Sequence, residues 1–129
     1  VQAIDPSETN KYGIVDLAQP ERLAVLRGIV EKPAPAAAPS HLGVVGRYIL
    51  TPRIFHHLET IPRGSGGEIQ LTDAIALLLK EESVYAYQFN GRRYDCGTKL
   101  GYLEATVAYA LRHSELAAEF RRSLETLVA

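Results

Sequence analysis

The feature that most constrains the fold is the end of the apolar run Leu23 to Val30, where Glu31 and Lys32 are followed by Pro33. Proline has no backbone N–H to donate to a sheet, so it predicts that the strand ends here. A residue before proline is biased toward extended backbone, and we therefore expect Lys32 to be extended. Neighbouring side chains of an extended segment diverge, so Glu31 and Lys32 are expected to address two different chemical groups. The alternative is a strand end with a solvated ion pair.

Three further strands are predicted around this one. Tyr12 to Leu17, with Gly13 inside it, is predicted to pair with Leu23 to Glu31 as a hairpin. A glycine inside a strand marks either a bulge that serves only the sheet or a close approach to the backbone. The nearly continuous apolar run Leu42 to Leu50 predicts a strand buried on both faces. The alternation from Val84 to Phe89 predicts the last strand.

Helices are predicted where apolar residues recur every three to four positions. Thr51-Pro52 predicts a helix start, with Ile54, Phe55 and Leu58 on its apolar side. The other predicted helices are one over Leu71 to Leu79 with Thr72 and Asp73 near its start, one after Thr98, and one from Leu116 to Leu127.

The remaining segments are predicted to be loops. Residues 1–10 form a polar loop and Ala34 to Ser40 a proline-rich connection. Asn90-Gly91 predicts a tight turn, after which the chain returns toward Asp95. Arg63 to Gly67 is glycine-rich but lacks the Gly-Lys-Ser/Thr ending of a phosphate-binding loop, so a flexible loop is favoured.

Composition excludes several classes of protein. The 129 residues are enough for one domain or a large piece of one, and 47% hydrophobic and 22% charged residues are ordinary for a soluble protein. A net charge of −1 creates no field toward nucleic acid or anionic membrane, and the apolar stretches are shorter than a bilayer span. We therefore expect no nucleic-acid or membrane partner. The single cysteine excludes an internal disulfide and fits the cytoplasm.

Five motifs occur in one order along nearly the whole chain. They are Lys11 to Asp16, Val30 to Pro33, Val45 to Tyr48, Gly67 to Ile75 and Asp95 to Tyr102. Each is weak alone, but together they closely resemble the C-terminal half of the bacterial UTP–glucose-1-phosphate uridylyltransferase family, the UDP-glucose pyrophosphorylases.

The resemblance implies an α/β fold, the C-terminal part of a Rossmann-like nucleotidyltransferase with a mixed sheet flanked by helices. We expect residues 1–129 to be one piece, with a sheet part over 1–98 and C-terminal helices over 99–129 that offer an assembly surface. The family's loop Gly-x-Gly-Thr-Arg-x-Leu-Pro-x-Thr-Lys does not occur here. We therefore expect a fragment that carries the sugar half of the site and is inactive alone.

The resemblance also implies a reaction, the formation of UDP-glucose and pyrophosphate from UTP and glucose 1-phosphate. Lys32 resembles the family lysine that contacts the phosphates, and is the expected catalytic residue. Glu31 resembles the glutamate that accepts hydrogen bonds from glucose hydroxyls, while Gly13 and Val44 are expected beside the sugar. Asp95 resembles a ligand of Mg²⁺, which it shares in the family with a second aspartate that is absent here; we expect no bound metal in the fragment. From the residues alone, a helix cap is the favoured interpretation of Asp95, and the metal ligand is what the resemblance implies.

Other reactive residues are not expected to carry chemistry. His56 and His57 are adjacent on a predicted helix and diverge by about 100°. His41 and His113 have no partner at the spacing of metal ligands. Nothing in the sequence near Cys96 predicts an activated thiol.

Two alternative functions remain open at this stage. The final two helices are suited to an oligomerisation module without activity of its own, and a homo-oligomer is expected in either case. A related pyrophosphorylase, such as a thymidylyltransferase, is the other alternative, because the residues that select the base lie mostly outside this half.

Overall fold

A computed structural model describes the backbone of residues 1–129 and every side chain except that of Ser65. It divides into two compact units, Val1–Asn90 and Gly91–Ala129, which are described separately.

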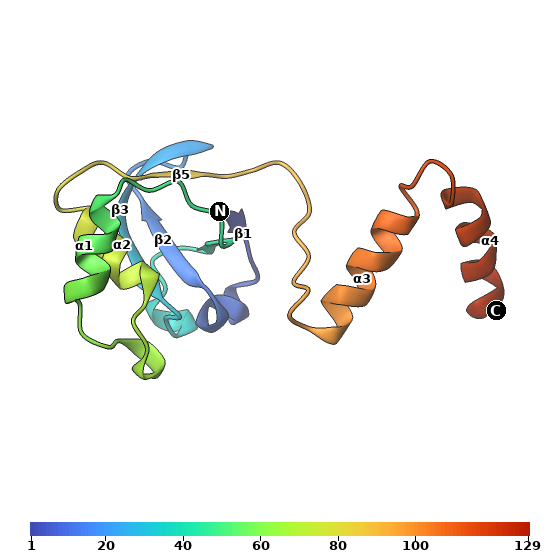
Figure 1. The fold of residues 1–129 in the computed structure, drawn as a ribbon, viewed down its shortest axis with the longest axis horizontal. Helices are drawn as coiled ribbons and strands as arrows, with labels where there is room; N and C mark the ends of the chain where they lie inside the picture. The colour runs from blue at the N-terminus through green and yellow to red at the C-terminus, as the bar shows by residue number, and fades with distance from the viewer. The chain divides into compact units, whose positions relative to one another are not determined.

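The first unit is a five-stranded sheet with two α-helices. In the order β1-β4-β2-β3-β5, every described pairing is antiparallel. Figure 1 shows α1 and α2 together on one side of the sheet. The strands are β1 (Gln2–Ala3), β2 (Gly13–Leu17), β3 (Leu23–Glu31), β4 (Leu42–Gly43) and β5 (Tyr85–Tyr87); the helices are α1 (Arg53–Thr60) and α2 (Leu71–Leu78), with 3₁₀ turns η1 (Pro6–Lys11), η2 (Pro35–Ala37) and η3 (Ser65–Gly67).

The core lies between the central strands and these helices. Leu78 and Ala74 of α2 are 0% exposed, and Ile54 reaches the same cluster from α1. Burying a leucine side chain stabilises a fold by about 1.5–3 kcal/mol, so this cluster is the main support of the unit. The buried members of the cluster are Val15, Leu26, Ile29, Ile54, Ala74, Ile75, Leu78 and Ala86.

An irregularity in the hairpin decides which way the end of β3 faces. The register of β2 on β3 shifts between Asp16 and Leu17, which leaves Arg27 without a partner in the ladder. Before the shift every second residue of β3 is buried, and after it the buried face continues at Ile29. Glu31 lies two residues further on and therefore shares the face of Ile29. Without the extra residue, Glu31 would lie on the opposite face.

Most predicted elements are confirmed, and the fold is an arrangement of helices and an antiparallel sheet that ends in helices. The hairpin, the strand that becomes β5 and all four α-helices are present. In β5, Ala86 is buried and Tyr85 and Tyr87 are exposed, as the alternation predicts. Residues 1–10 are less irregular than predicted, because β1 and most of η1 lie in them.

The predicted strand Leu42 to Leu50 is wrong beyond Gly43. Gly46 has φ of 77°, a left-handed conformation that interrupts an extended run, and Ile49 is fully exposed. Leu42 and Gly43 pair with other described strands, and the last backbone hydrogen bond to a strand is that of the Val44 N–H to the carbonyl of Gly13. A strand needs neighbours for its backbone groups as well as an apolar sequence.

Two smaller predictions are also wrong. Phe55 is 66% exposed and does not join the apolar side of α1. Asn90-Gly91 does not return the chain as a hairpin, since no described strand follows it and the two units divide at this dipeptide. A hairpin turn needs a strand directly before it, and β5 already ends at Tyr87, three residues before Asn90.

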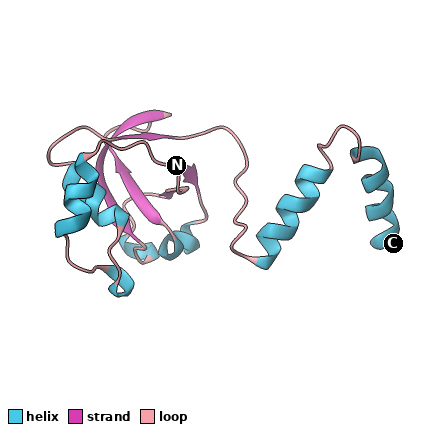
Figure 2. Ribbon diagram, viewed as in Figure 1, coloured by secondary structure: helices cyan, strands magenta, loops and turns pink.

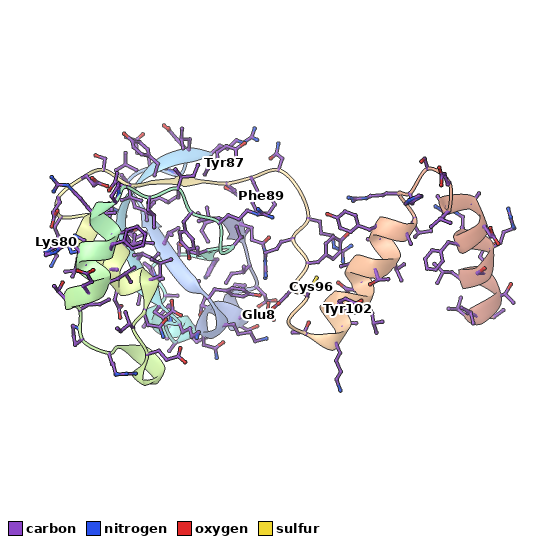
Figure 3. All side chains as sticks on the ribbon, viewed as in Figure 1. Glu8, Lys80, Tyr87, Phe89, Cys96 and Tyr102 are labelled. Atoms are coloured by element: carbon purple, nitrogen blue, oxygen red, sulfur yellow. The ribbon has the colours of Figure 1, made fainter. Side chains whose placement is uncertain are left out.

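The second unit consists of the helices α3 (Lys99–Ala110) and α4 (Ala117–Leu127), and Figure 2 shows no strand in it. Thr98 caps α3, because its Oγ1 accepts a hydrogen bond from the N–H of Gly101 at 3.0 Å. Neither helix contains a buried residue. Tyr102, whose side chain projects from α3 in Figure 3, is 59% exposed.

Within the described part of the chain, none of the helices has the length and apolar character needed to span a bilayer.

Candidate functional site

The site forms where the end of β3 meets the start of β2 and the first turn of α2. Glu31 is the last residue of β3 and pairs with Gly13, the first residue of β2. Its side chain is only 13% exposed. The register shift described above turns the carboxylate toward α2, where the hydroxyl of Thr72 donates a hydrogen bond to Oε2 at 2.8 Å. The hydroxyl of Thr72 therefore fixes one oxygen of the largely buried Glu31 carboxylate.

Gly13 is required by this arrangement. A Cβ atom at this position would come within 2.7 Å of the Thr72 methyl group and 3.3 Å of Glu31 Oε2. It would also lie 3.5 Å from Cγ2 of Val44, whose backbone N–H donates to the carbonyl of Gly13 at 2.9 Å. Of the two interpretations of Gly13, the close approach holds, and Gly13, Glu31 and Val44 lie together.

Lys32 differs from its predicted conformation. Its φ is 45°, so the expectation of an extended residue is wrong. Two tertiary hydrogen bonds outweigh the local preference: the Lys32 N–H donates to the carbonyl of Tyr12 at 3.0 Å, and the buried hydroxyl of Thr9 donates to the carbonyl of Pro33 at 3.1 Å. Positive φ costs a residue with a Cβ atom about 1–2 kcal/mol, so the chain holds strain at this position.

The two charges at the end of β3 do not diverge as expected. Lys32 Nζ lies 3.5 Å from Glu31 Oε1, and the lysine side chain is 48% exposed. At 3.5 Å the contact is longer than a charge-assisted hydrogen bond, and the lysine side chain is half-exposed, so the ammonium group can turn to another anion. Glu31 thus presents Oε1 toward Lys32, while Oε2 is held by Thr72.

The sequence analysis missed two residues of the site. Thr72 was expected only to begin a helix; the N-cap of α2 is Gln70, and Thr72 is turned to Glu31 instead. Tyr48 lies within one of the five motifs but received no role. Burial and the negative charge of Glu31 raise the pKa of Tyr48, which places the phenol in the electrostatic neighbourhood of the carboxylate. Both residues lie inside the ordered motifs, Thr72 in Gly67 to Ile75 and Tyr48 in Val45 to Tyr48, and no local pattern distinguishes either of them.

An open cavity of about 900 Å³ adjoins these residues. Val44 and Tyr48 line it, together with aromatic side chains such as Tyr85 and Phe89. The segment Val44 to Thr51, which follows β4, contributes to its lining.

Asp95 belongs to the second unit. Its Oδ1 accepts a hydrogen bond from the N–H of Gly97 at 3.1 Å, and its carbonyl accepts from Thr98. Thr98 rather than Asp95 caps α3, so the alternative of a helix cap is not what the structure shows. Among the described residues no three His, Cys, Asp or Glu side chains gather as a metal site. A lone carboxylate suits Mg²⁺ only where phosphate oxygens supply further ligands.

The other reactive residues lie outside the site. His57 is 7% exposed and its Nε2 is 3.2 Å from Oε1 of Glu81, a contact between α1 and the turn that follows α2. Cys96 is an exposed free thiol. Figure 3 shows it on the segment that leads into α3.

The fold and this cluster define a sheet-and-helix domain of the α/β class, with a candidate site for a polar ligand at the end of β3. Curated relatives are similar to this chain over nearly its whole length. The chain is 44% identical over 98% of its length to the UTP–glucose-1-phosphate uridylyltransferase of Staphylococcus epidermidis, and covers 44% of that protein. It is 48% identical over 97% of its length to UTP–glucose-1-phosphate uridylyltransferase 2 of Staphylococcus saprophyticus, and covers 45% of it. No family model matches the chain.

Solved structures agree. A UDP-glucose pyrophosphorylase from Acinetobacter baumannii superposes with a TM-score of 0.86 at 46% identity, covering 98% of this chain and 44% of that one. A UDP-glucose pyrophosphorylase complexed with UDP-glucose gives 0.81 at 42% identity, covering 87% and 43%. The resemblance seen in the sequence is confirmed: the chain is homologous to these uridylyltransferases and spans less than half of their length.

We predict that Gly13→Ala destabilises the first unit by about 1–3 kcal/mol, because the new methyl group overlaps that of Thr72. Thr72→Ser removes the obstructing methyl, so the loss caused by Gly13→Ala should be smaller in that background. Gly28→Ala is the control, since its Cβ would meet nothing nearer than 3.9 Å. Denaturant unfolding of the unaltered chain, the two single variants, the double variant and the control measures these differences; equal losses in both backgrounds would contradict the predicted overlap.

Lys32→Gly is predicted to raise stability and to abolish contact with anions. Relief of positive φ contributes about 1–2 kcal/mol and the greater unfolded-state freedom of glycine removes about 0.5–1 kcal/mol, which leaves a net gain of up to about 1.5 kcal/mol. Lys32→Ala is the matched control, because it removes the charge and keeps the strain. A thermal melt in which both variants shift equally would show that the backbone is not strained.

The pKa of Tyr48 is predicted to fall in Glu31→Gln, while staying above its ordinary value. Removing the carboxylate charge takes away one cause of the raised pKa, and burial, the larger cause, remains. An NMR pH titration follows the Tyr48 ring signal, assigned by its loss in Tyr48→Phe. Glu59→Gln, which removes an exposed charge from α1, should leave the pKa unchanged. An unchanged pKa of Tyr48 in Glu31→Gln would show that the charge of Glu31 does not act on Tyr48, and Tyr48 would no longer count as a residue of the site.

Proposed function

We propose that this chain is the C-terminal half of a UTP–glucose-1-phosphate uridylyltransferase and holds the glucose 1-phosphate. The observation that supports this most directly is the pairing of a held carboxylate, Glu31, with an exposed ammonium, Lys32, over a glycine backbone without a side chain. A hexose phosphate presents hydroxyls that can donate to the carboxylate and a phosphate that can bind the ammonium group. Relatives named for this activity and a neighbour complexed with UDP-glucose support the same ligand class.

In the proposed reaction a phosphate oxygen of glucose 1-phosphate attacks the α-phosphorus of UTP. The new phosphorus–oxygen bond forms as the bond to the pyrophosphate oxygen breaks, which yields UDP-glucose and pyrophosphate. Phosphoryl transfer of this kind depends on positioning and charge stabilisation and needs no covalent nucleophile. This agrees with a site that offers a lysine and a carboxylate and leaves Cys96 outside.

Each residue then has a separate task. Glu31 accepts hydrogen bonds from sugar hydroxyls through Oε1, the oxygen that Thr72 leaves available. Lys32 moves its ammonium from the weak ion pair to the sugar phosphate and is the proposed catalytic residue. Gly13, whose bare backbone lets Thr72 and Glu31 lie against it, and Val44 are proposed to lie beside the sugar.

Asp95 is proposed to contribute one carboxylate oxygen to Mg²⁺. Its Oδ1 is engaged by Gly97 and Oδ2 remains, which fits an ion held chiefly by substrate phosphates. Bound there, the ion would neutralise phosphate charge.

A homo-oligomer and a cytoplasmic location complete the proposal. The apolar side chains that α3 leaves exposed support assembly; they include Leu100, Tyr102, Leu103 and Tyr109. The alternatives of a pure assembly module or a thymidylyltransferase are not favoured, because the reported relatives are uridylyltransferases by name.

Binding to the 129-residue chain tests the proposal. We expect NMR titration to detect glucose 1-phosphate, with Lys32→Ala weakening both glucose 1-phosphate and inorganic phosphate. Glu31→Ala should weaken the binding of glucose 1-phosphate but not that of inorganic phosphate, because Glu31 is proposed to contact the sugar hydroxyls and not the phosphate. Lys80→Ala, an exposed lysine beyond the far end of α2, is the control. Mixed with UTP and glucose 1-phosphate, the chain alone should release no pyrophosphate. Release, or binding indifferent to Lys32, would contradict the proposal.

A further inference from the structure

The side chain of Thr72 donates a hydrogen bond to Glu31 from another element of the fold, 41 residues along the chain. It is 5% exposed and lies in the first turn of α2. An ionised carboxylate can only accept, so the Thr72 hydroxyl is the donor. A hydrogen bond to a charged group contributes about 1.5–3 kcal/mol when it is made, roughly twice a neutral one.

The bond has a geometric consequence for Glu31. Oε2 is held between the Thr72 hydroxyl and the bare backbone of Gly13, and Oε1 is left facing Lys32. A carboxylate with both oxygens free rotates about its last torsion, which is broad. Fixing one oxygen fixes the direction of the other, so the acceptor that remains points to one place.

The other end of the Thr72 side chain limits the space. Its Cγ2 methyl lies 2.7 Å from the position that a Gly13 Cβ would take, so it fills the space between the Gly13 backbone and α2. Thr72 belongs to α2, and Ala74, Ile75 and Leu78 of the same helix are almost fully buried in the core. Their packing fixes the position of Thr72. A rigid support is what a residue that orients another residue requires.

We propose that Thr72 is a positioning residue that sets the orientation of the sugar by holding Glu31 with its hydroxyl. The inference deepens the proposed function and rests on it, because the ligand it orients is the hexose of a hexose 1-phosphate. Thr72 acts on the hexose alone, since Lys32 meets the phosphate and has no contact with Thr72 among the hydrogen bonds described.

The test compares two near-isosteric variants of the 129-residue chain. Thr72→Val keeps the shape and removes the hydroxyl, and is expected to weaken glucose 1-phosphate binding about tenfold. Thr72→Ser keeps the hydroxyl and should stay within about threefold of the original affinity. Inorganic phosphate, titrated in parallel, should bind all three proteins equally. A purely structural role would instead weaken both ligands in Thr72→Val.

A ligand-free measurement separates the contact from the function. In denaturant unfolding, Thr72→Val and Glu31→Ala should not add, because each removes the same hydrogen bond. Additive losses overturn the contact and the inference. If the unaltered chain binds glucose 1-phosphate and Thr72→Val binds it equally well, the inference fails while the proposed function stands. If the unaltered chain binds inorganic phosphate but not glucose 1-phosphate, the proposed function fails and the sugar-orienting role fails with it.

Discussion

The extra residue in β3 is the constraint on which the rest of the site depends. By leaving Arg27 out of the ladder, the strand places both Leu26 and Ile29 in one core and carries Glu31 to the helix side of the sheet. The two consequences are inseparable, because side chains alternate along a strand and any change of phase moves every later residue. Core packing therefore enforces the direction of the functional carboxylate.

Turning a carboxylate toward the core side has an energetic cost that the site offsets locally. Burial of a charge is unfavourable unless hydrogen bonds or opposite charges replace water. Glu31 has the Thr72 hydroxyl on one oxygen and the Lys32 ammonium near the other. The strained φ of Lys32 is maintained by backbone bonds on either side of it. Partial burial and strain at the same residues are typical of sites kept for binding rather than stability.

The proposed chemistry is divided between two compact units. The residues proposed for the hexose phosphate lie in Val1–Asn90, where a packed core makes their geometry rigid, and Asp95 lies in Gly91–Ala129, in the segment before α3, a helix that buries none of its residues. The rigid unit suits recognition of a sugar with fixed stereochemistry. A single exposed carboxylate suits a metal ion whose other ligands come with the substrate.

Periodicity and turn chemistry in the sequence were sufficient for the hairpin, β5 and the four helices, and the order of motifs was sufficient for the family and for Glu31 and Lys32 as candidates. These signals are local, or depend only on order along the chain. Only the tertiary structure decided the positive φ of Lys32, the early end of β4, and the role of Thr72 beside Glu31. Each of these depends on partners far away in sequence. A strand without a neighbour, or a hydroxyl that meets a carboxylate 41 residues away, leaves no periodic trace in the chain.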